Sequence, residues 1–206
     1  MTYMIKQFLV FGLLLISSCQ SWDSAFTYSE FIPLIKDITI GEEDIELSEE
    51  YISKQPYSFL RVDLGKGANI IMVLQKIENG LHIWISEHQE KIVTYNGKII
   101  KTEGLKHNIE IFNHFQFKYF SNLNNHKGEY NTFLKNPKAF VEQKFSISLI
   151  EESDVLLFEE KIFIESLNKK YSNFYWLDRK TGQPIRSKQN IHPSMPNIRL
   201  DYIYKY

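Results

Sequence analysis

The 206-residue chain contains a single cysteine, so an intramolecular disulfide is excluded. None of its six histidines shows the His-x-x-x-His or Glu-x-x-His spacing of a metal site. The sequence has no Gly-x-Ser-x-Gly nucleophile motif, and Gly65-Lys66-Gly67 is not followed by the Gly-Lys-Ser/Thr of a phosphate-binding loop. We therefore expect a protein without metal or cofactor that is not an enzyme.

An excess of charge of either sign is also lacking, because 24 basic side chains stand against 25 acidic ones. A nucleic-acid-binding protein would show a strongly basic domain or patch. Disorder is excluded as well, since hydrophobic residues make up 43% of the chain and can fill a core. A chain of this length buries about 70% of its unfolded surface as one domain. We expect a single globular domain that does not bind nucleic acid.

The first residues have the three-part plan of a secretory signal. Lys6 precedes an apolar run from Phe8 to Ile16, and the small residues Ser17 and Ser18 follow. This apolar run is too short to span a bilayer as a helix. The pattern predicts a signal peptide over residues 1–18 that is removed from the mature protein.

The four residues Ile16-Ser17-Ser18-Cys19 resemble the lipobox of bacterial lipoproteins. In that family the signal is cut before the cysteine, which is then acylated. The resemblance implies a lipid anchor at Cys19, and acyl chains hold a protein on a membrane surface. Gln20 stands where an aspartate would imply retention in the inner membrane, so we expect the outer membrane, with residues 19–206 as one periplasmic domain. A plain signal peptide, or a buried helix with an incidental cysteine, is the alternative.

The segment Pro56–Leu105 predicts consecutive antiparallel strands joined by tight turns. Polar and apolar residues alternate from Tyr57 to Leu64, the period of a half-buried strand. Two Asn-Gly pairs favour type I′ turns, whose twist matches that of the flanking strands. The expected strands are 57–64, 69–77, 81–86 and 91–95, with turns at Asn79-Gly80 and Asn96-Gly97.

Further strands are expected toward the C-terminus, at 140–150, 155–167, 173–177, 185–190 and 198–206. One short amphipathic helix is predicted at Ala25–Ile35, after the signal peptide. The acidic run Gly41–Glu50 is expected to be a solvated loop or turn, and residues 106–137 are the least regular part. Strands at regular spacing with turn signals predict an all-β fold, an antiparallel meander that forms a curved sheet or partial barrel.

Two blocks of sequence are similar to the YjbF/GfcB family of lipoproteins, which is named for group 4 capsule polysaccharide. The first block comprises Pro56-Tyr57-Ser58, Trp84 with Ser86, and Gly97-Lys98-Ile99-Ile100-Lys101-Thr102-Glu103-Gly104-Leu105; the second comprises Trp176-Leu177-Asp178, Thr181-Gly182 and Ser187-Lys188-Gln189. Lys98 stands where the family usually has arginine, so the planar fork of a bidentate contact is lost. The resemblance implies a role in making or exporting a surface polysaccharide, together with other capsule-export proteins, and carries no catalytic residue.

Exposed aromatic and basic side chains are the candidate contacts for a glycan or a protein partner. Aromatic rings stack on the apolar C–H faces of sugars, but they also dominate the packing of cores. Trp84 and Trp176 therefore have a core interpretation too, as does the aromatic cluster from Phe112 to Tyr130. The candidates are Trp84, Lys98, Tyr119, Phe120 and Trp176.

Three functions remain open at this stage. The first is a non-catalytic binding or scaffolding module in capsule or exopolysaccharide assembly. The second is a carrier of lipid or acylated protein, which would need a large dry aliphatic cavity. The third is a glycan-modifying enzyme, which would need two carboxyl groups facing one cleft, about 5–10 Å apart. The adjacent glutamate pairs of the sequence do not meet that need, because neighbouring residues on a strand point to opposite faces.

Overall fold

A computed structural model of the chain describes residues 48–65, 69–114 and 126–205, all of which fall in a compact unit over Lys36–Tyr206. Within these ranges the chain forms one α-helix, one 3-10 helix and twelve strands. They are α3 (Glu49–Lys54), β1 (Phe59–Asp63), β2 (Ile70–Glu78), β3 (Leu81–Ser86), β4 (Lys91–Tyr95), β5 (Lys98–Glu103), β6 (Ile109–Ile111), β7 (His126–Lys135), β8 (Lys138–Glu152), β9 (Val155–Ile164), η4 (Glu165–Leu167), β10 (Lys169–Asp178), β11 (Pro184–Gln189) and β12 (Ile198–Ile203).

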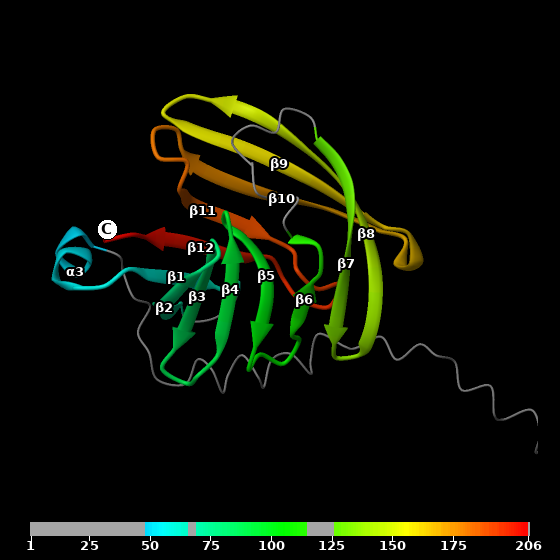
Figure 1. Cartoon of the computed structure of the whole chain (residues 1–206), viewed down its shortest axis with the longest axis horizontal. Helices are drawn as coiled ribbons and strands as arrows, with labels where there is room; N and C mark the ends of the chain where they lie inside the picture. Colours follow the sequence, from blue (N-terminus) through cyan, green and yellow to red (C-terminus); the bar gives the residue numbers. More distant parts are fainter. Residues whose placement is uncertain (1–47, 66–68, 115–125, 206) are drawn as a thin grey trace, which may run out of the picture. The chain divides into compact units, whose positions relative to one another are not determined.

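The twelve strands of the described chain follow one another in a closed antiparallel barrel (Figure 1). Each strand pairs with its neighbours in sequence, and β1 pairs with β12 to complete the ring. The predicted all-β antiparallel meander is confirmed, and the sheet closes completely. Closure removes the unpaired edges that an open sheet would expose.

Two tight turns set the register of the first strands. Asn79 and Gly80 have φ values of 52° and 79°, and Asn96 and Gly97 have φ values of 48° and 84°. Positive φ at both central residues is the requirement of a type I′ turn, so both predicted turns are confirmed. The strands β3 and β4 that they flank have the predicted bounds.

The segment 106–137, expected to be the least regular part, contains β6 and β7; inward side chains of β7 such as Thr132 and Tyr130 are polar and hide its alternation in the sequence. One expectation from the sequence is wrong. The described helix α3 begins inside the predicted acidic loop: Ser48 caps its N-terminus, and Glu49 and Glu50 lie in its first turn. Acidic groups stabilise that end of a helix dipole. The helix expected at Ala25–Ile35 lies outside the described residues.

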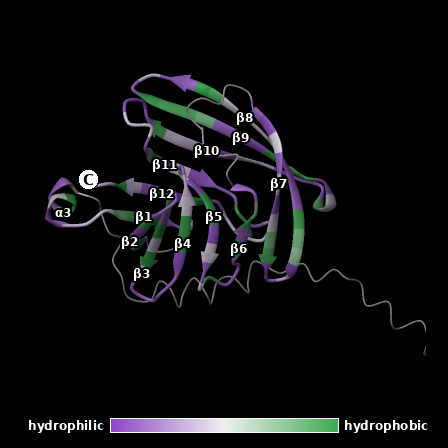
Figure 2. Ribbon diagram, viewed as in Figure 1, coloured by the Kyte–Doolittle hydropathy of each residue, from purple (hydrophilic) through white to green (hydrophobic). Residues whose placement is uncertain are grey.

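Hydrophobic and hydrophilic positions alternate along the strands (Figure 2). One set of side chains fills the interior, with Leu60, Trp84, Phe158, Tyr175 and Leu200 almost completely buried. Burial of apolar area contributes about 25 cal/mol per Å² and is the main stabilising term. Among the described residues no helix is both long and apolar enough to cross a membrane.

The seam that closes the barrel carries a charged ladder. Asp201 on β12 faces Arg61 on β1 and Arg186 on β11. Arg61 donates to Oδ2 of Asp201 from Nη2 at 2.7 Å, and Arg186 donates to Oδ1 from Nε at 2.5 Å. Burial acts to raise the pKa of Asp201, but the hydrogen bonds from the two arginines lower it overall. The first and last strands are therefore joined by an ionised carboxylate.

Candidate functional site

The turn between β4 and β5 faces the interior rather than solvent. The carbonyl oxygen of Gly97 accepts hydrogen bonds from Gln189 Nε2 and Tyr202 Oη, both at 2.8 Å. The same Gln189 side chain accepts the N–H of Ile99 at 2.9 Å. Its amide therefore satisfies backbone groups that a neighbouring strand would otherwise satisfy. This turn also has no room for a side chain, since a Cβ on Gly97 would lie 2.9 Å from Pro184 Cβ.

Lys98 follows this turn and points into the interior. Its Nζ lies 2.5 Å from Glu160 Oε1 on β9, and it donates to Tyr130 Oη at 3.2 Å. The second carboxylate oxygen of Glu160 accepts from Tyr175 Oη at 2.7 Å and from Asn173 Nδ2 at 3.0 Å. Burial lowers the pKa of Lys98, and Glu160 opposes that shift. A fully buried ion pair thus connects opposite parts of the barrel wall.

Further hydrogen bonds extend this network across the interior. Gln143 Oε1 accepts from Tyr130 and Tyr171, both at 2.9 Å, while its Nε2 donates to Thr132. The cavity next to Lys98 has a volume of about 10 Å³, which is about the space of one water molecule. Polar side chains therefore fill this part of the interior, and it has no room for an acyl chain.

The structure corrects the expectation that Trp84 and Lys98 are exposed. Trp84 is 0% exposed and donates from Nε1 to Thr94 at 3.0 Å, and Lys98 is 1% exposed. Lys98 is buried because the turn before it folds inward, and Trp84 is buried because it occupies an inward position of β3. Trp176 is half-buried on β10, beside the ring of Phe174. Tyr119, Phe120 and Cys19 lie outside the described residues.

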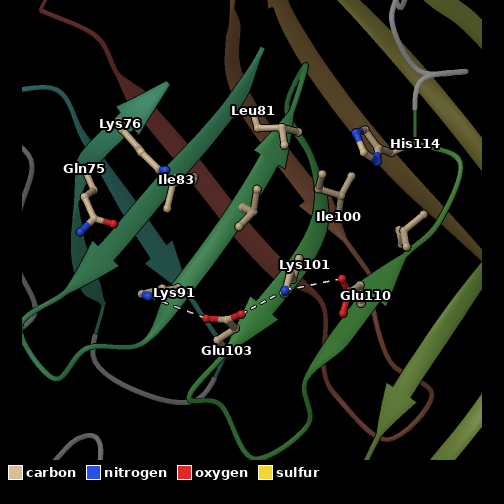
Figure 3. A pocket seen from close by; sticks show the side chains of 12 residues that line it. Gln75, Lys76, Leu81, Ile83, Lys91, Ile100, Lys101, Glu103, Glu110 and His114 are labelled. Atoms are coloured by element: carbon tan, nitrogen blue, oxygen red, sulfur yellow. Dashed lines mark ion pairs between the residues drawn. The ribbon is translucent and has the colours of Figure 1, made fainter. Parts of the chain in front are cut away.

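A groove of about 640 Å³ lies across β2–β6 (Figure 3). On β3 its lining side chains Leu81 and Ile83 alternate with the buried Trp84. The floor of the groove is aliphatic and consists of Leu81, Ile83, Val93, Ile100 and Ile111. A row of charges crosses it, with Lys91–Glu103 at 3.8 Å, Glu103–Lys101 at 3.1 Å and Lys101–Glu110 at 3.5 Å. The groove therefore combines an apolar surface with charges that largely neutralise one another.

This outward face continues onto β7 and β8. Lys101 pairs in register with Glu110, Glu110 with Phe133, and Phe133 with Phe140. The rings of Phe133 and Phe140 are 4.7 Å apart, and Phe112 lies 6.1 Å from Phe140. Phe140 is 72% exposed, which is unusual for so large an apolar side chain. We call Phe112, Phe133 and Phe140 the aromatic platform.

Sequence reasoning found only part of this platform. Phe112 belongs to the aromatic cluster that the sequence marked, but Phe140 was expected only as part of a strand. The alternation Phe140, Glu142, Lys144 contrasts with Val141, Gln143, Phe145 and shows two faces. It does not show which face is inside, because both carry phenylalanine and both carry polar residues.

Two carboxylates of the groove come close together through Lys101. Both Glu103 and Glu110 contact its ammonium group. The hydrogen bond from Lys101 lowers the pKa of Glu103. A general acid of glycoside hydrolysis requires a raised pKa. Glu103 therefore lacks the raised pKa of a general acid.

Metal ligation has no support in the part of the chain that the structure describes. No group of three or more histidine, cysteine, aspartate or glutamate side chains there could hold a metal ion.

The residues of the two family blocks have structural roles. Thr102 Oγ1 accepts the N–H of Ile109 at 3.0 Å and so links β5 to β6. Asp178 Oδ1 accepts from the backbone N–H groups of Lys180 and Thr181, and Gly182 has a φ of 70°. Asp178 and Gly182 thereby shape the β10–β11 turn. These residues of the two family blocks therefore act in turns and in links between strands.

The chain thus forms a closed antiparallel β-barrel with a packed interior, and the groove and the aromatic platform lie on its wall. The chain belongs to the family described as group 4 capsule polysaccharide lipoprotein gfcB, YjbF, which matches residues 32–203. The resemblance inferred from the sequence is thereby confirmed.

Relatives with known sequences or structures support the same assignment. The uncharacterized lipoprotein GfcB of Escherichia coli K12 is 25% identical over 78% of this chain and 82% of its own. The uncharacterized lipoprotein YjbF of the same organism is 27% identical over 46% of this chain and 42% of its own. The crystal structure of the hypothetical lipoprotein YmcC from Escherichia coli has a TM-score of 0.68 at 21% identity, over 79% of this chain and 91% of that one. This structural match shows that the two chains share a fold.

Proposed function

We propose that the protein is an outer-membrane lipoprotein, anchored through Cys19 with its barrel in the periplasm. In this proposal it acts in capsule or exopolysaccharide assembly or export, as a non-catalytic binding or scaffolding module. Membership of the capsule polysaccharide lipoprotein family supports the process and the anchor. The polysaccharide and the capsule-export proteins are its expected partners.

The observation that carries the binding role is the aromatic platform beside the groove. Phe112 and Phe140 are 42% and 72% exposed; Phe140 stands on β8, and Phe112 directly follows β6. Ring faces pack against the C–H faces of sugars, and clusters of exposed apolar side chains mark contact sites. The aliphatic floor and charged rows of the adjoining groove suit a protein segment with both apolar and charged residues.

The interior argues against the two rival functions. A carrier would hold an acyl chain in an apolar cavity, whereas the space beside Lys98 is about 10 Å³ and is lined by polar groups as well as aliphatic ones. An enzyme would need an accessible carboxylic acid, whereas Glu160 is 0% exposed and is held by three donors. Neither arrangement supports a reaction or a cargo inside the barrel.

The function can be tested in a bacterial strain that lacks this protein. Loss of the protein should reduce surface polysaccharide, and Phe133→Ala with Phe140→Ala should fail to restore it while folding normally. Ile185→Ala, a change of an exposed apolar residue on β11, is the matched control and should restore polysaccharide fully. If the deletion leaves surface polysaccharide unchanged, the proposed function is wrong.

The anchor has a separate test. Cys19→Ser should release the mature protein from membranes and abolish labelling by a fatty-acid probe, because the thiol that carries the lipid is gone. Unchanged fractionation and labelling would contradict the lipid anchor. Separation of inner and outer membranes then reports which bilayer holds the unaltered protein.

A further inference from the structure

A second outward surface lies on β7–β10 and carries four lysines around one ring. Two rows of paired residues cross the strands there: Glu129, Lys144, Phe163 and Lys170 in one row, and Lys127, Ser146, Lys161 and Ser172 in the next. Together they border a shallow groove of about 530 Å³. We call Lys127, Lys144, Lys161, Lys170 and Phe163 the lysine face.

The charges of this face are partly neutralised. Lys144 contacts Glu165 at 2.7 Å, and the carboxylates of Glu129 and Glu142 also attract it, but Glu165 is 72% exposed. Lys161 lies 3.5 Å from Glu159 and is itself 67% exposed. Exposed pairs of this kind contribute little and exchange easily. Within the described residues Lys127 and Lys170 have no ion-pair partner, and Lys170 Nζ lies 5.4 Å from the centre of the Phe163 ring.

We propose that the lysine face binds an acidic polysaccharide, a chain of sugars that carry carboxylate groups. This inference rests on the proposed function, because it names the class of glycan that the same protein would bind. The lysines supply complementary charge at several points along a chain, and Phe163 supplies an apolar ring for a sugar face. Within each row the two lysines stand on alternate strands, about 10 Å apart, and such a spacing suits a repeating anion better than a single one.

The path of the strands extends this surface toward the aromatic platform. Phe140, Glu142, Lys144 and Ser146 occupy the same face of β8. At about 3.3 Å per residue, Phe140 lies about 13 Å along the strand from Lys144. A polysaccharide chain that lies along β8 would therefore contact lysines at one end and phenylalanines at the other.

The test uses the full-length protein in detergent and labelled polygalacturonate oligomers, whose sugars each carry a carboxylate. We expect the oligomers to bind and neutral dextran not to bind, with affinity that falls as ionic strength rises. Lys127→Glu with Lys170→Glu should weaken binding by about tenfold or more, because two attractive charges become repulsive. Lys180→Glu with Lys188→Glu changes the net charge equally on exposed positions of the β10–β11 hairpin and should have no effect.

Each other outcome overturns the inference. Equal loss in both double variants would mean that net charge alone attracts the glycan. Equal binding of dextran would mean that the lysines do not select acidic sugars. Lysine-dependent binding to vesicles of anionic lipid, without binding of polygalacturonate, would make this face a membrane contact. If the double variant fully restores surface polysaccharide in a strain where the deletion reduces it, the inference is wrong and the proposed function stands.

Discussion

Lysine occurs in two opposite settings in this barrel. A buried lysine stabilises the fold, whereas exposed lysines can contact a ligand. Lys98 is 1% exposed inside the ring and has a carboxylate at 2.5 Å. Lys127 and Lys170 lie on the outside, in the lysine face. Burial of a charge costs several kcal/mol unless a partner compensates it, whereas a solvated charge costs little. The interior network therefore maintains the fold, and the outer lysines are available to a ligand.

The interior ion pair should give the largest effect when it is broken. Lys98→Met leaves Glu160 buried without its counter-charge, and we expect a loss of about 3–5 kcal/mol in the free energy of unfolding. Urea unfolding followed by tryptophan fluorescence measures it. Adding Glu160→Gln to Lys98→Met should recover part of the loss, since the orphaned charge is then removed. A loss below about 1 kcal/mol in the single variant would show that the pair contributes little.

A substitution in the turn that precedes Lys98 should give the second-largest loss in the free energy of unfolding. Gly97→Val places a β-branched residue at a φ of 84° and a Cβ 2.9 Å from Pro184, so we expect a loss of about 2–3 kcal/mol. Gly182→Val is the matched control, because Gly182 has a φ of 70° but no atom within 4 Å of its Cβ position. The difference between the two variants in thermal unfolding isolates the packing of the turn. Equal losses would mean that only backbone strain matters there.

A substitution in the charged seam between β1 and β12 should give the third-largest loss in the free energy of unfolding. Asp201→Asn removes the charge that faces Arg61 and Arg186 on a half-buried surface, and we expect a loss of about 1–2 kcal/mol. The partners are in different strands, so a double-mutant cycle with Arg61→Met measures their coupling. Additive losses in that cycle would contradict a seam that depends on the pair.

An effect of similar size is expected from acidification. His192 is 1% exposed and lies 4.8 Å from the ring of His107. Burial, together with the neighbouring His107, lowers the pKa of His192 from 6.5 to about 4. The unfolded chain then binds the proton more tightly, so stability is full above pH 6.5 and falls as the pH is lowered toward 4. We expect a loss of about 2 kcal/mol between pH 7 and pH 5.

This loss should disappear in one variant only. His192→Gln carries no titrating ring, so its unfolding free energy should depend less on pH over that window. His88→Gln, a change at an exposed position, should keep the full dependence. Equal dependence in both variants would exclude His192 as the source.

The outer lysines should give the smallest effect on stability. Lys127→Glu with Lys170→Glu should change the free energy of unfolding by less than about 0.5 kcal/mol, because both side chains are solvated. The same variant is expected to lose glycan binding. A large loss of stability would show that these lysines maintain the fold, and the contrast with Lys98 would then fail.

The sequence by itself determined the local features of this protein. Alternation and two Asn-Gly pairs define β1–β4 and their turns, because a type I′ turn needs only the two residues that form it. The blocks around Gly97 and Trp176 indicate the family, and the structure explains them as turns and links between strands. The single cysteine after an apolar run predicts the anchor at Cys19, which remains a prediction.

Only the tertiary structure decided which residues are inside. The closing pair Arg61 and Asp201 is separated by 140 positions, and no local pattern encodes such a contact. Lys98 was expected outside because lysine is rarely buried, but Glu160 and Tyr130 contact it from strands far along the chain, and Tyr175 and Asn173 hold Glu160 in place. Alternation reveals that a strand has two faces. Where both faces carry polar and aromatic residues, as on β7 and β8, the partner strands determine which face is buried.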